Sequence, residues 1–456
     1  MSRPTLSSLG TWLWKRRGLL LVTLAALAVR LVWNLRVHRP IDFAFSDMAG
    51  YLDRANLMLD KPATKGPWLT LFPYGTHYFI FAVKRLFGRD NATALGVAYA
   101  VLGALAVGYT YATAGRFIPR AWARVVVGLV LIVYYPWISL GGYALSEIPF
   151  AVCVAASTFY GLRLADQGRR ADAWRLGLAL GLGAVVRPQI LLAAVLLAVH
   201  VVFRRRAWRH FTAGLVVRAA APLALLLALS SYRLHAQVGV WGLVSTNGPL
   251  NFVFGRCHNT GLDAVSASAR GFFGPPPLGA LLQYQKEHKD ALFTLDPALG
   301  ETLTIQGNMW DAAPNYALAA RCVRKTGYFR QIKYAVTHVV LLWGYNAIWP
   351  DQGQKPRWRE PMMSSLAAHN TFILPGAAVA LLLSLRRRRA RALLVAIQVW
   401  SLIFTSMLYF GDTRYRAPYD GLLILLAMTT YLDVLSLPQR LRDRLHERLA
   451  RPRSVG

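Results

Sequence analysis

The chain contains a series of long apolar stretches that are separated by short clusters of arginine. A helix needs about 20 mostly apolar residues to cross the hydrocarbon core of a membrane. Hydrophobic residues make up 55% of the 456 residues and charged residues only 16%, although the formal net charge is +31. This combination excludes a disordered chain and a polar, soluble nucleic-acid-binding protein. The sequence therefore predicts an all-α polytopic membrane protein.

Ten apolar stretches are candidate membrane spans. They cover residues 19–37, 91–114, 125–140, 145–164, 174–186, 190–203, 211–232, 372–385, 393–410 and 418–435. The positive-inside rule places loops rich in Lys and Arg in the cytoplasm. With ten spans and both termini inside, basic clusters such as those at residues 204–206 and 386–389 fall on the cytoplasmic side. A signal peptide is the alternative for the first stretch, but its apolar run continues past the small-residue site at residues 26–28.

This topology divides the chain into three parts. Residues 1–233 form an N-terminal transmembrane module, in which residues 38–90 are a first outer loop with interfacial helices. Residues 234–369 form a large outer segment, and residues 370–456 hold the last spans and a basic cytoplasmic tail. Residues 334–349 are rich in Trp and Tyr, which suit the headgroup region. We therefore predict a further interfacial helix there.

Acidic residues stand out on the predicted outer face. Asp42 and Asp47 follow the first span, and Asp47 starts a predicted amphipathic helix in which Tyr51 shares its face. Glu147 begins another span at the outer surface. A carboxylate at an enclosed membrane surface can act as general base on a hydroxyl group. The alternatives are that Asp42 and Asp47 are solvated loop residues and that Glu147 only favours the start of its helix.

Three outer arginines run against the positive-inside rule. Arg187 lies in Arg187-Pro188-Gln189, which divides two apolar runs that are short for membrane spans. Arg414 and Arg416 lie between the last two spans. Their planar guanidinium groups suit the phosphate of a lipid-linked molecule. The alternatives are an ordinary turn at Arg187, and pairing with Asp412 or snorkelling for the other two.

The remaining polar features are less specific. Asn247 and Asn251 lie in a turn-rich loop at the start of the outer segment, where their side-chain amides are available for hydrogen bonds. Cys257 and Cys322 both lie outside, where a disulfide can persist, and their pairing stays open at this stage. The scattered histidines show no HExxH pattern, so the sequence predicts no metal site.

Six short motifs, taken in order along nearly the whole chain, resemble those of the GT-C class of integral-membrane glycosyltransferases. This class includes protein O-mannosyltransferases and bacterial transferases that modify lipid A with aminoarabinose. The matching segments are Ser46-Asp47-Met48-Ala49-Gly50-Tyr51, Phe72-Pro73-Tyr74-Gly75-Thr76-His77-Tyr78, Ala144-Leu145-Ser146-Glu147, Val186-Arg187-Pro188, residues 246–255 and Arg414-Tyr415-Arg416-Ala417-Pro418. Met48 departs from the pattern because Glu is common there, which argues against a metal site built from two neighbouring carboxylates.

The resemblance implies a GT-C fold with about ten spans and a catalytic module in residues 1–233. It also implies transfer of a hexose or pentose from a polyprenyl-phosphate donor to an envelope lipid, glycan or protein. Asp47 would deprotonate the acceptor and Glu147 would orient the acceptor or a neighbouring cation. The remaining residues implied in substrate binding, with Asp42 also the reserve base, are Asp42, Tyr51, His77, Arg187, Asn247, Asn251, Arg414, Tyr415 and Arg416.

The same resemblance implies a location in the bacterial inner membrane, with cytoplasmic termini and an extracytoplasmic site among membrane lipids. The sequence requires no cofactor, gives no support for a divalent cation, and implies no nucleic-acid partner. One alternative is a transporter or flippase, for which Arg30 and Arg218 would be intramembrane charges. Others are a glycan ligase that uses a lipid-diphosphate donor and a non-enzymatic assembly protein. Convergence of the acidic and basic outer residues in one cavity would favour the enzyme.

Overall fold

The computed structural model describes residues 6–203, 212–257, 261–265, 270–273, 302–306, 311–344, 347–353, 356–386 and 390–436. Within these ranges, eight helical segments are long and apolar enough to cross a membrane. They are Arg17–Val37, Ala92–Phe117, Ala121–Gly141, Glu147–Gln167, Ala213–Val238, Arg357–Ser384, Ala390–Leu408 and Thr413–Leu435. The basic residues at 204–206 and 387–389 and the tail after residue 436 lie outside the described residues. The predicted all-α membrane fold is confirmed.

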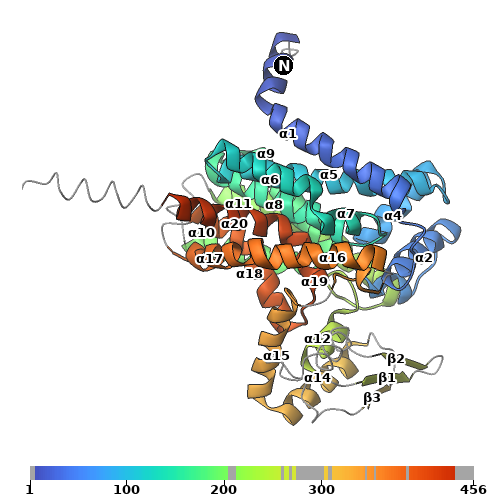
Figure 1. Ribbon diagram of the computed structural model, residues 1–456. Helices are drawn as coiled ribbons and strands as arrows, with labels where there is room; N and C mark the ends of the chain where they lie inside the picture. The colour runs from blue at the N-terminus through green and yellow to red at the C-terminus, as the bar shows by residue number, and fades with distance from the viewer. Residues whose placement is uncertain are drawn as a thin grey trace, which may run out of the picture.

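The N-terminal helices form one side of the bundle in Figure 1. Two of them are short, because α9 has 17 residues and α10 has 14. The elements are α1 (Leu6–Val32), η1 (Trp33–Val37), α5 (Ala92–Phe117), α6 (Ala121–Val133), α7 (Tyr135–Gly141), α8 (Glu147–Gln167), α9 (Arg170–Val186), α10 (Ile190–Phe203) and α11 (Ala213–Val238). Arg187 follows the last residue of α9, so the predicted break between the two short helices is confirmed.

Small residues let α9 and α11 approach closely. A Cβ atom at Gly177 would lie 1.9 Å from the carbonyl oxygen of Ala219, and one at Gly181 would lie 2.6 Å from Leu226 Cδ1. This spacing of four residues places both glycines on one face of α9, as in other tightly packed membrane helices. The contact fixes the C-terminal end of α9, where Arg187 lies.

Arg30 of α1 has a structural use inside the bundle. Its side chain is buried and donates hydrogen bonds to the carbonyl oxygens of Leu131 (3.4 Å) and Ile132 (3.3 Å). These carbonyls belong to the last turn of α6. No N–H group of the same helix binds them, because the chain bends at Tyr134 into α7. Arg218 lies on α11 and donates to the carbonyl of Gly214. Arg30 therefore has a structural explanation that needs no transport pathway.

The first outer loop folds into short helices that pack on the bundle. These are α2 (Asp47–Asp60), α3 (Trp68–Leu71) and α4 (Gly75–Phe87). The buried guanidinium of Arg54 lies 3.8 Å from the ring centre of Trp68 and 4.4 Å from that of Phe72. This cation–π contact holds the loop that follows α2 against the helix itself. The N-terminus of α2, where Asp47 begins the helix, is thereby placed at the bundle surface.

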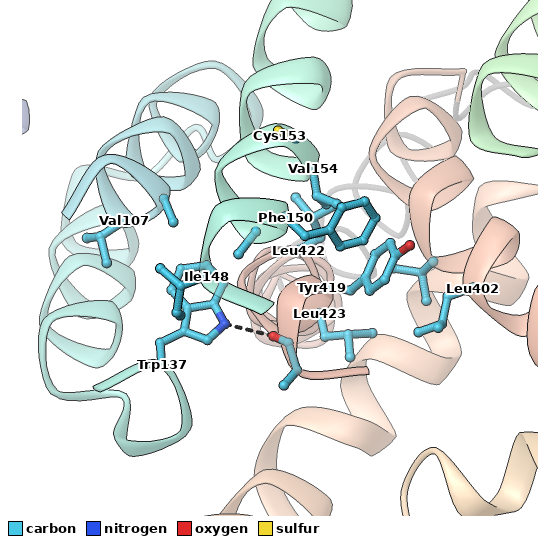
Figure 2. Packing of buried hydrophobic residues seen from close by; sticks show 14 of the residues in the cluster. Val107, Trp137, Ile148, Phe150, Cys153, Val154, Leu402, Tyr419, Leu422 and Leu423 are labelled. Atoms are coloured by element: carbon cyan, nitrogen blue, oxygen red, sulfur yellow. Dashed lines mark hydrogen bonds between the residues drawn. The ribbon is translucent and has the colours of Figure 1, made fainter. Parts of the chain in front are cut away.

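The C-terminal helices complete the bundle. They are α16 (Pro356–Ala368), η5 (His369–Ile373), α17 (Leu374–Ser384), α18 (Ala390–Leu408), α19 (Thr413–Arg416), η7 (Ala417–Tyr419) and α20 (Asp420–Leu435). Figure 2 shows how they join the N-terminal half. Trp137 Nε1 of α7 donates to the carbonyl of Ala417 at 2.7 Å, and the ring of Phe150 on α8 meets Tyr419 edge-on at 5.8 Å. This core fixes the start of α20 and the short helix α19 before it.

The large outer segment adds a lobe to one side of the bundle (Figure 1). Its elements are α12 (Gly248–Arg256), β1 (Gly261–Val265), β2 (Arg270–Phe273), β3 (Thr302–Gln306), α14 (Ala312–Thr326) and α15 (Tyr328–Leu341). The strands form a small sheet in the order β2-β1-β3, with β1 antiparallel to β2 and parallel to β3. A disulfide joins Cys257 and Cys322 and so ties α12 to α14. Helix α15 ends at Leu341, so the helix predicted for residues 334–349 begins earlier and stops short of Trp349.

The segment after α15 returns to the bundle through a buried carboxylate. Asp351, in η4 (Asp351–Gly353), accepts hydrogen bonds from Ser139 Oγ and from the Tyr143 hydroxyl, both at 2.6 Å. Burial raises the pKa of Asp351 to about 6, although these two hydrogen bonds favour the ionised form. The anchor fixes the position of Trp349, two residues earlier.

This anchor predicts a pH-dependent stability. Because the pKa of Asp351 is about 6 in the folded chain and 3.8 ordinarily, the folded state binds more protons between these values. The stability that the protonated carboxyl contributes is therefore lost as the pH rises through about 6. We expect the difference in thermal midpoint between the native chain and Asp351→Asn, measured in detergent, to shift in favour of the variant between pH 4.5 and 7.5. A difference that is constant with pH would contradict this account.

Candidate active site

A cavity of about 1640 Å³ opens where the outer ends of the bundle meet the outer lobe. It is lined by the start of α2, the loop before α4, the Arg187 turn, the chain from α11 to α12, Trp349 and the segment between α18 and α19. Leu191, Leu192 and Leu402 line its apolar part, whereas Ser146, Asn247 and Asn251 contribute polar groups. The cavity therefore combines an apolar wall with polar and charged groups, as in other sites for small ligands.

Glu147 is the centre of the charged cluster next to this cavity, although it does not itself line the cavity. It is the first residue of α8, is fully buried, and its Oε1 atom accepts hydrogen bonds from Arg187 Nη2 and Arg414 Nε. A carboxylate at a helix N-terminus also interacts favourably with the helix dipole. Glu147 thus starts its helix and also pairs with two arginines.

Asp47 reaches the same cluster from the opposite side. Its Oδ2 atom accepts a hydrogen bond from Arg414 Nη1 at 2.7 Å, and 32% of its side chain is exposed. The preceding residue, Ser46, has φ of +50°, which is unusual for a residue other than glycine. Such backbone conformations are costly and cluster at functional sites. Asp47 is therefore the most accessible member of the charged cluster.

Arg187 is held more tightly than an ordinary turn residue. Its Nε donates to Ser146 Oγ at 2.8 Å, and its guanidinium lies 5.1 Å from the ring centre of Tyr415. Only 8% of the residue is exposed. Among the described residues, its Nη1 atom and Glu147 Oε2 are buried without a hydrogen-bond partner. Arg187 lines the cavity, so its Nη1 atom is available to a bound ligand, since buried polar groups are rarely left unpaired.

Arg414 is oriented by groups on every side. Asp412 caps α19 by accepting the backbone N–H of Arg414 at 2.8 Å, and burial raises the pKa of the Asp412 carboxyl. The guanidinium lies 4.4 Å from the ring centre of Trp349, and 11% of the side chain is exposed. Asp47, Glu147, Arg187 and Arg414 therefore converge in one cluster, of which all but Glu147 line the cavity.

Arg416 does not join this cluster. It is fully buried and pairs with Asp420 at 2.9 Å, one helical turn along the chain. Tyr134 donates to the same carboxylate at 2.6 Å and also contacts His369 at 2.9 Å. Because Arg416 lies two residues after Arg414, the helical backbone points the two side chains to different sides. Arg416 thus belongs to a buried network that joins α6, η5 and α20.

Some of the other predicted site residues line the cavity, and others lie away from it. Asn247 and Asn251 line the cavity with Tyr51 and Tyr415, and burial raises the pKa of Tyr51. Asp42 lies outside the cavity lining and pairs with Arg39 at the surface, with 2.7 Å between the charged atoms. His77 is fully buried on α4, also away from the cavity lining, and burial lowers its pKa well below the ordinary value.

Trp349 and Gln189 line the cavity, although neither was predicted as a site residue. Trp349 was included in a predicted interfacial helix, although the proline that follows it was a signal for a turn. Gln189 follows Pro188 and donates to the Tyr419 hydroxyl at 3.0 Å. Over the described residues, no group of three or more His, Cys, Asp and Glu side chains could hold a metal ion.

Comparison with known protein families matches one segment of the chain. Residues 72–232 match the family described as dolichyl-phosphate-mannose-protein mannosyltransferase. No curated protein matches the chain. This matched segment contains Glu147 and Arg187, whereas Asp47 and Arg414 lie outside it.

Solved structures show the fold. The oligosaccharyltransferase of Archaeoglobus fulgidus is 14% identical, with a TM-score of 0.50 over 95% of this chain and 52% of that protein. The chain thus spans about half the length of that enzyme. ArnT from Cupriavidus metallidurans, solved with undecaprenyl phosphate, is 17% identical with a TM-score of 0.39, over 91% of this chain and 78% of its own. The chain is an integral membrane protein with a GT-C fold, and the predicted resemblance is confirmed.

The geometry predicts that substitutions of Glu147 and Asp47 lower the stability of the folded chain by different amounts. Glu147→Gln leaves two buried guanidinium groups poorly compensated, and breaking a buried ion pair costs about 3–5 kcal/mol. Asp47→Asn breaks a partly exposed pair, for which the cost is about 1 kcal/mol or less. We expect Glu147→Gln to lower the thermal midpoint in detergent clearly more than Asp47→Asn does. An equal or reversed order would show that Glu147 does not hold the cluster together.

Proposed function

We propose that this chain, which has the fold of GT-C glycosyltransferases, transfers a sugar from a polyprenyl-phosphate donor to an acceptor hydroxyl of the cell envelope. The observation that carries the proposal is that Asp47, Arg187 and Arg414 line one cavity beside an apolar wall. The fully buried Glu147 pairs with both arginines. A lipid-linked sugar phosphate needs these features, because it has an apolar tail, an anionic phosphate and a reacting sugar carbon. The family matched by residues 72–232 is described by such a donor, dolichyl-phosphate-mannose.

In the proposed reaction, Asp47 accepts the proton of the acceptor hydroxyl. The acceptor oxygen then forms a bond to the anomeric carbon, while the bond from this carbon to the phosphate oxygen breaks. The leaving polyprenyl phosphate takes the bonding electrons and gains one negative charge. Arg187 and Arg414 stabilise this charge. Preorganised hydrogen-bond donors of this kind usually make the largest single contribution to lowering a reaction barrier. Glu147 holds both guanidinium groups in place.

The extracytoplasmic location of the proposed reaction is supported by the distribution of charge. The cluster lies where α8 begins and α9 ends. At the opposite ends of the same bundle, Arg163 pairs with Asp172 at 3.1 Å and Arg116 with Asp166 at 3.2 Å. Basic residues concentrate on the cytoplasmic side of membrane proteins. The cavity is thus expected to face away from the cytoplasm, in the inner membrane of a bacterium.

A transfer assay with the purified protein tests the proposal. Donors would be radiolabelled polyprenyl-phosphate sugars, in hexose and pentose forms, with envelope lipids, glycans and peptides as candidate acceptors. We expect Asp47→Asn to lower the transfer rate by about 10²–10⁴-fold, the usual contribution of a general base. Asp53→Asn is the matched control, because Asp53 is exposed on the same helix and lies outside the cavity lining.

Three outcomes would reject parts of this proposal. Full activity in Asp47→Asn would exclude Asp47 as the base. Activity only with polyprenyl-diphosphate donors would instead indicate a glycan ligase. Movement of the lipid across a membrane without transfer of its sugar would indicate a flippase.

A further inference from the structure

The guanidinium group of Arg414 already binds two carboxylates. Its Nε atom donates to Glu147, its Nη1 atom donates to Asp47 at 2.7 Å, and the ring of Trp349 lies over its face at 4.4 Å. An arginine binds phosphate most strongly when two of its N–H groups are directed at the phosphate oxygens. The Asp47 carboxylate thus occupies part of the surface that a phosphate would use.

Of the two carboxylates that pair with Arg414, Asp47 is the one that can move away from the guanidinium group. Glu147 is fully buried, is also bound to Arg187, and belongs to a membrane-spanning helix. Asp47 is 32% exposed and lies at the first residue of α2, and among the described residues its ion pair is with Arg414. A partly exposed pair of this kind contributes about 1 kcal/mol or less. Because this pair is weak, a phosphate that offers two oxygens to the N–H groups of Arg414 can replace Asp47.

The balance of charge favours the same exchange. Asp47 and Glu147 offset the charges of the two guanidinium groups, Asp412 lies next to them, and a donor phosphate adds a further negative charge. If Asp47 stayed on Arg414, it would lie beside the phosphate as a second anion in a partly buried site, which is unfavourable. Moving Asp47 away from the arginine relieves this repulsion.

We propose that Asp47 is a built-in substitute for the donor phosphate on Arg414, and that donor binding displaces it toward the acceptor hydroxyl. This inference rests on the proposed function, because it uses the same base and the same phosphate-binding arginine. The base is then released only in a site that already holds donor. The exchange changes ion-pair partners and involves no covalent step.

A double-mutant cycle on binding tests the exchange. The probe is undecaprenyl phosphate in detergent, and the measured quantity is its dissociation constant for the native chain, Asp47→Asn, Arg414→Gln and the double variant. Loss of a competing pair worth about 1 kcal/mol corresponds to about fivefold tighter binding by Asp47→Asn. We expect no such gain when Asp47→Asn is added to Arg414→Gln, because the competition acts through the arginine.

The outcomes distinguish displacement of Asp47 from Arg414 from simple electrostatic repulsion between the Asp47 carboxylate and the phosphate. If Asp47→Asn tightens binding equally with and without Arg414, the carboxylate only repels the phosphate and the exchange is rejected. Unchanged or weaker binding in the single variant rejects it too. Asp53→Asn is the control on the same helix and should leave binding unchanged. Arg414→Lys replaces Arg414→Gln if the latter fails to give a cooperative thermal transition.

The test also distinguishes this inference from the proposed function. Sugar transfer by the native chain without tighter binding in Asp47→Asn would overturn the exchange and leave the transferase intact. Tighter binding that depends on Arg414, in a chain that transfers no sugar from any donor, would support the exchange as a binding event and reject the transferase.

Discussion

A buried glutamate held between two arginines is the interaction on which this site depends. Glu147 starts α8, Arg187 follows α9 and Arg414 lies in α19, so one carboxylate joins three elements that are distant in sequence. Such a buried cluster is weak evidence for stability, because desolvation opposes the attraction between its charges. Its effect is instead to specify position, since each charge has low energy only when the other two are present. The outer ends of the helices are thereby aligned at the cavity.

The surrounding structure serves to hold this cluster in place. Close packing of α9 on α11 fixes the end of α9, and the core around Trp137 and Tyr419 fixes the chain next to α19. The outer segment contributes through Asp351, whose hydrogen bonds to α7 and the loop after it place Trp349 on the face of Arg414. The cavity is therefore built from both halves of the chain. This explains why the family match, which is confined to residues 72–232, contains only part of the cluster.

Sequence alone predicted the membrane helices and singled out Asp47, Glu147, Arg187 and Arg414, which the structure brings together, because apolar length and misplaced charge are local signals. It could not separate Arg414 from Arg416, since their different directions depend on the phase of a four-residue helix and on the distant partner Asp420. The burial of His77 and the pairing of Asp42 with Arg39 likewise depend on the packing of the first outer loop. The disulfide between Cys257 and Cys322 required the distance between α12 and α14, which sequence does not contain.

The two carboxylates of the site differ in the kind of element that carries them. Glu147 belongs to a helix buried in the bundle, whereas Asp47 belongs to a short peripheral helix with an exposed side. Under the proposed function, the carboxylate that holds the phosphate-binding arginines thus belongs to a helix that also determines the fold. The proposed base belongs to a peripheral helix, whose exposed side can change at little structural cost. Under the proposed function, the acceptor can therefore diversify in a lineage of such proteins while the mode of holding the donor is inherited unchanged.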